Sequence, residues 1–123
     1  MDNNEYKINE ILDNFIQNST ITKRQLSIIY NKLNMHGPMK NISSGAYYRQ
    51  IKQCREKTKG ILYSIILLNL YGAIDKDTIS VLKKTVEQIE DVVVTNNEKK
   101  LSQENIMNVI SLIEQIVDKC VTI

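Results

Sequence analysis

The sequence predicts an all-α fold. One proline and four glycines occur among the 123 residues, so few positions interrupt a regular helix. Apolar residues recur at spacings of three and four, the period of a helix with one buried side, along nearly the whole chain. With 42% apolar residues, the chain is long enough for one domain with its own core. We therefore expect a single helical domain over residues 1–123 that contains five helices.

The first two helices carry clear sequence signals. The first runs from about Asn4 to Gln17, and its buried stripe comprises Ile8, Ile11, Leu12, Phe15 and Ile16. The second begins at Thr22, whose side chain caps the helix while Gln25, three residues later, returns the bond in a capping box. Its expected core face comprises Leu26, Ile29, Tyr30 and Leu33. Glycine and proline predict a turn over residues 34–38.

A third and much longer helix is predicted to follow the cap Ser43. Its first half is cationic, its second half is expected to be core, and Gly72 is expected to end it. Gly60 lies where the halves meet and leaves a kink or a short break there as an alternative. The expected core face follows spacings of four and three through Tyr47, Ile51, Cys54, Thr58, Ile61 or Leu62, Ile65 and Leu68.

Two more helices make up the acidic part of the chain, residues 74–123. Asp75 is predicted to cap the fourth helix, which the polar residues 95–98 interrupt. Its apolar stripe is the predicted homodimerisation surface, with packing inside one chain as the alternative, and it comprises Ile79, Leu82, Val86, Ile89 and Val93. The fifth helix runs from Ser102 to about Cys120 and presents Ile106, Val109, Ile110, Ile113, Ile116 and Val117.

Charge is distributed very unevenly along the chain. Nine basic residues and one acidic residue, Glu56, lie between Thr22 and Lys59, a net charge of +8. The other positions hold seven lysines and thirteen acidic residues, a net charge of −6, so the overall +2 conceals a basic segment. A concentrated cationic field beside the adjacent Tyr47 and Tyr48 is typical of a surface that binds nucleic acid phosphates. The alternative is a solvated basic face.

Catalytic, metal and cofactor sites are not indicated. His36 is the only histidine, and its place beside Gly37 and Pro38 predicts an exposed turn residue rather than a general base. The sequence has no phosphate-binding glycine loop, nucleophile elbow or paired metal-ligand motif. Cys54 and Cys120 lie on apolar helical positions, so we expect reduced core thiols. We expect a protein that is not an enzyme and binds no cofactor and no metal.

The sequence also predicts a cellular location. Its N-terminus lacks a cationic start followed by an apolar run, so no secretory signal is expected. The longest apolar stretch, residues 61–71, contains Ser64 and Asn69 and is about half the length of a membrane span. We expect a soluble, cytoplasmic, nucleoid-associated protein without membrane contact. Heavy use of Ile, Asn and Lys suits an AT-rich archaeal or bacterial genome.

Two short motifs carry a family resemblance over about residues 21–59. The segments Ile21-Thr22-Lys23-Arg24 and Ile42-Ser43-Ser44-Gly45, followed by Arg49, match a pattern in which an Ile-Thr-x-Arg opening helix precedes an Ile-Ser-x-Gly-x-x-x-Arg helix. The chain here resembles helix-turn-helix DNA-binding domains. The resemblance implies that the second of these helices is a recognition helix. It further implies DNA contacts from Ser44, Tyr48, Arg49 and Lys52.

The leading hypothesis is a DNA-binding protein, a transcriptional regulator or nucleoid-associated factor, that grips duplex DNA as a homodimer. Its expected nucleic-acid-binding residues are Lys23, Arg24, Lys40, Ser44, Tyr48, Arg49, Lys52, Arg55 and Lys59. Tyr47 is expected to be a core aromatic rather than a base contact. Single-stranded DNA or RNA binding and a non-enzymatic module that docks onto an acidic protein are the alternatives.

Overall fold

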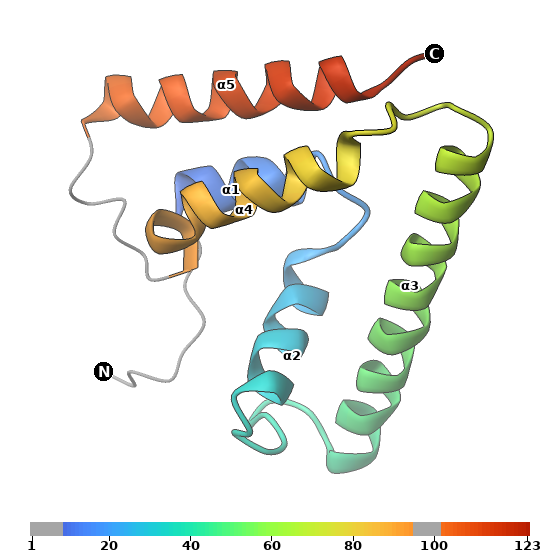
Figure 1. The fold of residues 1–123 in the computed structure, drawn as a ribbon. Coiled ribbons are helices and arrows are strands. Elements are labelled where there is room, and N and C mark those ends of the chain that lie inside the picture. Colours follow the sequence, from blue (N-terminus) through green and yellow to red (C-terminus); the bar gives the residue numbers. More distant parts are fainter. Residues whose placement is uncertain (1–8, 95–101) are drawn as a thin grey trace. The chain divides into compact units, whose positions relative to one another are not determined.

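The computed structural model describes residues 9–94 and 102–123, without the side chains of residues 91–94 (Figure 1). Within these residues the chain forms five helices and no strand, which confirms the all-α prediction. The helices are α1 (Glu10–Gln17), α2 (Lys23–Leu33), α3 (Ser44–Leu70), α4 (Thr78–Val94) and α5 (Gln103–Cys120). They belong to two compact units: a basic unit, residues 16–63, and an acidic unit, residues 9–15 and 64–123. None of the described helices is long and apolar enough to cross a membrane.

The start of α2 is fixed by the predicted capping box. The Gln25 N–H donates to Thr22 Oγ1 (3.1 Å), and the Thr22 N–H donates to Gln25 Oε1 (3.0 Å). The two bonds satisfy backbone donors that the first turn of a helix leaves open. After α2 the chain reverses through Met35 and Gly37, both with positive φ (57° and 74°), and residues 34–43 contain no helix. The structure therefore joins α2 directly to α3.

Helix α3 begins where the sequence predicts and passes through Gly60 without a break. The Ser43 hydroxyl accepts a hydrogen bond from the Ala46 N–H (3.2 Å) at the helix start. Gly72, with φ at 74°, follows the last turn, and the Ala73 N–H donates to the Leu68 carbonyl (2.8 Å). The alternative of a break at Gly60 is excluded, and Gly72 ends the helix as predicted.

In the acidic unit the predicted cap of α4 is wrong by two positions. Helix α4 begins at Thr78, and the Asp77 carbonyl accepts the first helical bond, from the Val81 N–H (3.0 Å). The backbone of Asp75 is instead bonded to the end of α5, since its N–H donates to the Cys120 carbonyl (2.8 Å). The Asp75 side chain accepts from the Asp77 N–H (3.1 Å) in the turn before the helix.

Two other helix starts in the acidic unit are fixed by side-chain caps. Ser102, the predicted start of the fifth helix, caps α5 by accepting from the Asn105 N–H (3.1 Å). Asn9 caps α1, because its side chain accepts from the Leu12 N–H (2.7 Å). The helix therefore begins at Glu10, and the prediction of a helix that passes through Asn9 is wrong. The predicted start of the first helix near Asn4, and Ile8 of its stripe, lie outside the described residues, as does the break at residues 95–98.

Burial differs from the sequence prediction more than the helix bounds do. In α2 the buried side chain is Ile28, which the predicted core face omitted, and Leu33 of that face is 75% exposed. The second half of α3 is not core: Ile61 and Ile65 are half-buried, but most of its large apolar side chains are exposed. Among the side chains of α4 up to residue 90, those of Thr78 and Thr85 are buried, and the Thr85 hydroxyl donates to the Val81 carbonyl (2.8 Å). These differences arise because burial depends on which neighbouring helix covers a face.

The cysteine and aromatic predictions are confirmed. Cys54 and Cys120 are free and buried. Tyr47 is 1% exposed and belongs to the core of the basic unit. Ile11 of α1 and Ile106 of α5 are buried in the acidic unit, where the Gln103 amide also donates to the Glu10 carboxylate (3.1 Å).

Candidate nucleic-acid interface

The basic unit is a pair of helices held together by a small apolar core. Ile28 from α2 and Tyr47 and Cys54 from α3 form this core. Partly buried apolar side chains pack around it: Ile29, Met39, Ile42 and Ile51. Because Met39 and Ile42 come from the loop before α3, the core also fixes the start of that helix.

Tyr47 joins the two helices through its hydroxyl as well as its ring. The hydroxyl donates a hydrogen bond to Asn31 Oδ1 on α2. Burial raises the pKa of Tyr47, and the neighbouring Tyr48 raises it further. The phenol is therefore held in its neutral, hydrogen-bond-donating form.

Gln25 is a second link between the helices. Its side-chain oxygen accepts from Lys57 Nζ (2.9 Å) as well as from the Thr22 backbone, and its carbonyl accepts from Cys54 Sγ (3.8 Å). Burial raises the pKa of the Cys54 thiol, an effect that the charge of Lys57 opposes. Lys57 thus serves the contact between α2 and α3, and the remaining cations of α3 are those available to a ligand.

Four predicted site residues share the outer face of α3. At about 100° per residue, Tyr48, Lys52, Arg55 and Lys59 fall within an arc of roughly 60°, centred about 120° around the helix from Tyr47 and Cys54. Arg55 and Lys59 also line a second cavity, of about 480 Å³, together with Ile28 and Cys54. All four side chains are exposed. We call these four residues the outer basic face. Lys59 also pairs with Glu56 at 3.8 Å, a contact that is half-exposed and weak.

Tyr48 is held at the edge of this face by an aromatic contact. Its ring stands edge-on to Tyr47, with centroids 5.4 Å apart and planes at 70°. Tyr47 is held in place by the core and by its hydrogen bond to Asn31. The backbone of Tyr48, the next residue of α3, is therefore held in place as well.

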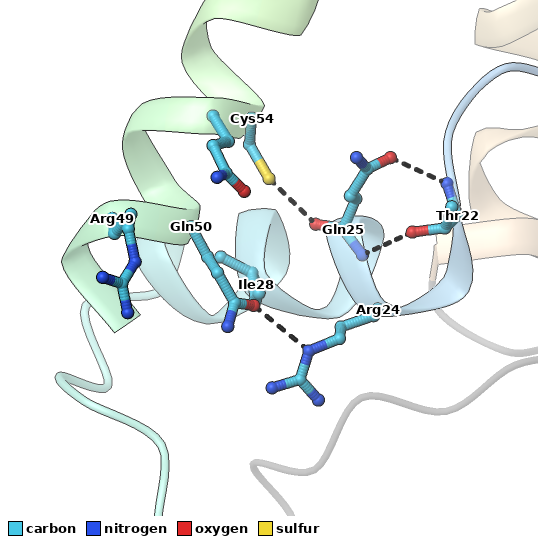
Figure 2. Close-up of a pocket in the computed structure, with 8 residues that line it drawn as sticks. Thr22, Arg24, Gln25, Ile28, Arg49, Gln50 and Cys54 are labelled. Atoms are coloured by element: carbon cyan, nitrogen blue, oxygen red, sulfur yellow. Dashed lines mark hydrogen bonds between the residues drawn. The ribbon is translucent and has the colours of Figure 1, made fainter. Parts of the chain in front are cut away.

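Arg24 and Arg49 meet at a shallow cavity of about 370 Å³ between α2 and α3 (Figure 2). Arg24 Nε donates to Gln50 Oε1 (3.1 Å), so the two helices are also bridged at this edge. Gln50 and Gln53 line the cavity beside the two arginines. An arginine and a glutamine side by side offer the two side chains that most often read guanine and adenine in the major groove.

Gln50 and Gln53 were not among the predicted site residues. The signal that identifies them is their angular position: at 100° per residue, both follow Arg49 on the side of α3 that turns toward α2. The bond from Arg24 depends on how the two helices pack, and no local pattern contains it.

The other predicted residues are exposed but line neither of the cavities in the basic unit. Lys23 is the first residue of α2, Lys40 lies in the loop, and Ser44 is the first residue of α3. His36 is exposed, as predicted, with its ring edge-on to Tyr30 (centroids 6.2 Å apart). Among residues 9–94 and 102–123, no three metal-binding side chains come together.

The predicted dimerisation stripe lies on α4. Ile79, Leu82 and Val86 are exposed, and Ile89 is half-buried. The side chain of Val93 lies outside the described residues. These side chains are open to a partner, and pairing through them stays a prediction.

Comparison of this chain with protein-family models, with curated proteins and with solved structures found no match.

Proposed function

We propose that this protein binds duplex DNA through the outer basic face of α3, as a transcriptional regulator or nucleoid-associated factor. The observation that supports the proposal is that the first half of α3 carries core side chains on one side and exposed basic side chains on another. One side is packed against α2 through Ile28, Tyr47 and Cys54, and an adjacent side presents the outer basic face. A rigid helix with an exposed cationic face suits insertion into the major groove.

Arg49 and Gln50 suit base readout, whereas Lys52, Arg55 and Lys59 suit phosphate contacts. Arg49 and Gln50 carry planar groups with paired hydrogen-bonding atoms, and they lie together at the cavity beside Arg24. The other three are long, exposed cations spaced along successive turns of α3.

Burial of Tyr47 favours duplex DNA over single strands. A stacking platform needs exposed aromatic rings, and only Tyr48 of the two adjacent tyrosines is open to a base. A protein partner with an acidic surface would use the same cations, so the test must separate these ligands.

The test compares two double variants that remove equal charge. Lys52→Ala/Arg55→Ala should weaken binding to duplex DNA at least roughly tenfold and reduce the slope of log K against log salt by about 2, since two phosphate contacts are lost. Lys83→Ala/Lys84→Ala, on the exposed surface of α4, serves as the control and should bind nearly as the wild type does.

Fluorescence anisotropy at two salt concentrations measures both quantities, with duplex DNA, single-stranded DNA and RNA as ligands. All of these residues are exposed, so the melting temperature should change little in either variant. Equal affinities for the two double variants would exclude the outer basic face as the DNA-binding surface. Tighter binding to single strands or RNA would contradict the duplex assignment.

A further inference from the structure

The second half of α3 is apolar on nearly all sides and is interrupted only by Ser64 and Asn69. No charged residue occurs from Gly60 to Ile74. A helix that is apolar all round is normally buried, either in a core or against another chain. Here only one side of the helix is partly covered: Ile61 and Ile65 on that side are half-buried. The side chains on the opposite side are exposed.

The open side is one continuous surface along α3 and the residue that follows it, Tyr71. Its six side chains form two adjacent rows at four-residue spacing and cover roughly half the helix circumference. Each is between 54% and 86% exposed. We call this set the apolar face, and it comprises Leu62, Ile66, Leu70, Tyr63, Leu67 and Tyr71.

The size of this surface matches a protein interface. From their exposed fractions, the six side chains present on the order of 800 Å² per chain, about what each partner contributes to an interface of standard size. An exposed apolar patch of this size marks an interaction site in soluble proteins.

We propose that a second copy of this chain docks on the apolar face, with the two α3 helices antiparallel across a two-fold axis. A two-fold contact brings the same side chains of the two copies together. Charged faces would repel each other in such a contact, whereas uncharged apolar faces can pair. In the antiparallel arrangement, Lys59 precedes the face in one copy and meets its far end in the other, where Asp75, Lys76 and Asp77 follow with a net charge of −1. The ends of the interface then carry opposite charges.

The exposed apolar side chains of α4 and α5 form smaller surfaces. On α4, Ile79, Leu82 and Val86 share an arc of only about 60°. On α5, Met107, Leu112 and Val117 point about 140° apart in succession and form no common face. The face on α3 is thus the widest of the three, and the proposal places the pairing there rather than on the α4 stripe.

Three single substitutions at matched exposure test the proposal. Ile66→Asp, Val86→Asp and Leu112→Asp alter side chains on α3, α4 and α5 that are 54%, 57% and 54% exposed. Each new charge stays in water in the monomer, so none should unfold it, and circular dichroism checks this. The proposal does not depend on DNA binding, because the measurement is the mass of the protein alone.

Sedimentation equilibrium of the full chain at micromolar concentration should give twice the 14.2 kDa chain mass for the wild type. Ile66→Asp should weaken dimerisation at least roughly a hundredfold, because it places two carboxylates in one apolar contact. The variants on α4 and α5 should stay dimeric. A monomeric wild type, or dissociation by Val86→Asp or Leu112→Asp in place of Ile66→Asp, would overturn the proposal.

A cross-linking measurement covers the case in which Ile66→Asp does not fold. Leu67 lies near the middle of the apolar face, where a two-fold axis brings a residue close to its own copy. Leu67→Cys should therefore form a disulfide-linked dimer with diamide as the oxidant, and Leu112→Cys should not. The native Cys54 and Cys120 are buried and contribute little background. Equal cross-linking of the two variants, or none in either, would contradict an axis at Leu67.

Discussion

The two halves of α3 use the same helical backbone in opposite ways. In the first half, residues 44–59, Tyr47 and Cys54 are buried against α2 while the outer basic face is exposed. The second half, residues 60–70, has no charge and yet buries none of its side chains fully. Apolar content therefore does not decide burial along this helix. What decides it is whether another element covers the face, as α2 covers the first half.

The largest expected effect comes from the core that holds the first half in place. Ile28→Ala should lower the free energy of unfolding by about 2–5 kcal/mol, because it leaves a cavity against Tyr47 and Cys54. Leu33→Ala on the same helix removes a side chain that is 75% exposed and should change stability by less than about 0.5 kcal/mol. Urea denaturation followed by circular dichroism measures both. Similar losses in the two variants would show that the contrast between covered and uncovered faces is wrong.

Helix ends were predictable where local chemistry fixes them. Thr22 and Ser43 each cap a helix with a hydroxyl, as predicted. Ser102, predicted only as the start of the fifth helix, caps it in the same way. Asp75 failed as a predicted cap because a hydrogen bond from its backbone to Cys120, 45 residues away in sequence, holds it outside the helix. Such a long-range bond leaves no trace in the residues nearby.

The site was predictable to a similar extent. Exposure of Tyr48, Lys52 and Arg55 follows from the helical period alone, because another side of α3 carries the core residues. Two contacts depend on the packing of α2 against α3 and were not predictable from the sequence. They are the hydrogen bond from Arg24 to Gln50 and the hydrogen bond from the half-buried Lys57 to Gln25. The apolar stretch of α3 was expected to be core, but most of its large side chains are exposed. Composition alone does not reveal whether another part of the chain covers such a stretch.

A smaller effect is expected for the hydroxyl of Tyr47. Tyr47→Phe keeps the buried ring but removes the bond to Asn31, and should cost about 1 kcal/mol near neutral pH. Tyr48→Phe, whose side chain is exposed, serves as the control and should cost much less. Urea unfolding of both variants and the wild type at pH 8 makes the comparison.

The same variant has a pH signature. Because the pKa of Tyr47 is raised in the folded protein, the folded state keeps a proton that the unfolded state releases above pH of about 10. This contribution to stability is fully present below that pH and is lost as pH rises toward the folded pKa. The wild type and Tyr48→Phe should therefore lose more stability between pH 8 and pH 10.5 than Tyr47→Phe does. Parallel losses in all three would contradict the buried, hydrogen-bonded state of this phenol.

The smallest expected effect lies at Gly60, the junction of the two halves. Gly60→Ala should raise the free energy of unfolding by about 0.5–1 kcal/mol, because α3 is helical through this position and alanine restricts the unfolded chain more than glycine does. A methyl group there meets no atom within 4 Å. Gly72→Ala should instead destabilise the protein, since Gly72 has a φ of 74°. Thermal unfolding of both variants tests the pair. A loss of stability on Gly60→Ala would show that α3 needs a bend at this junction. The two halves would then be separate helices, and the comparison of two faces on one helix would be wrong.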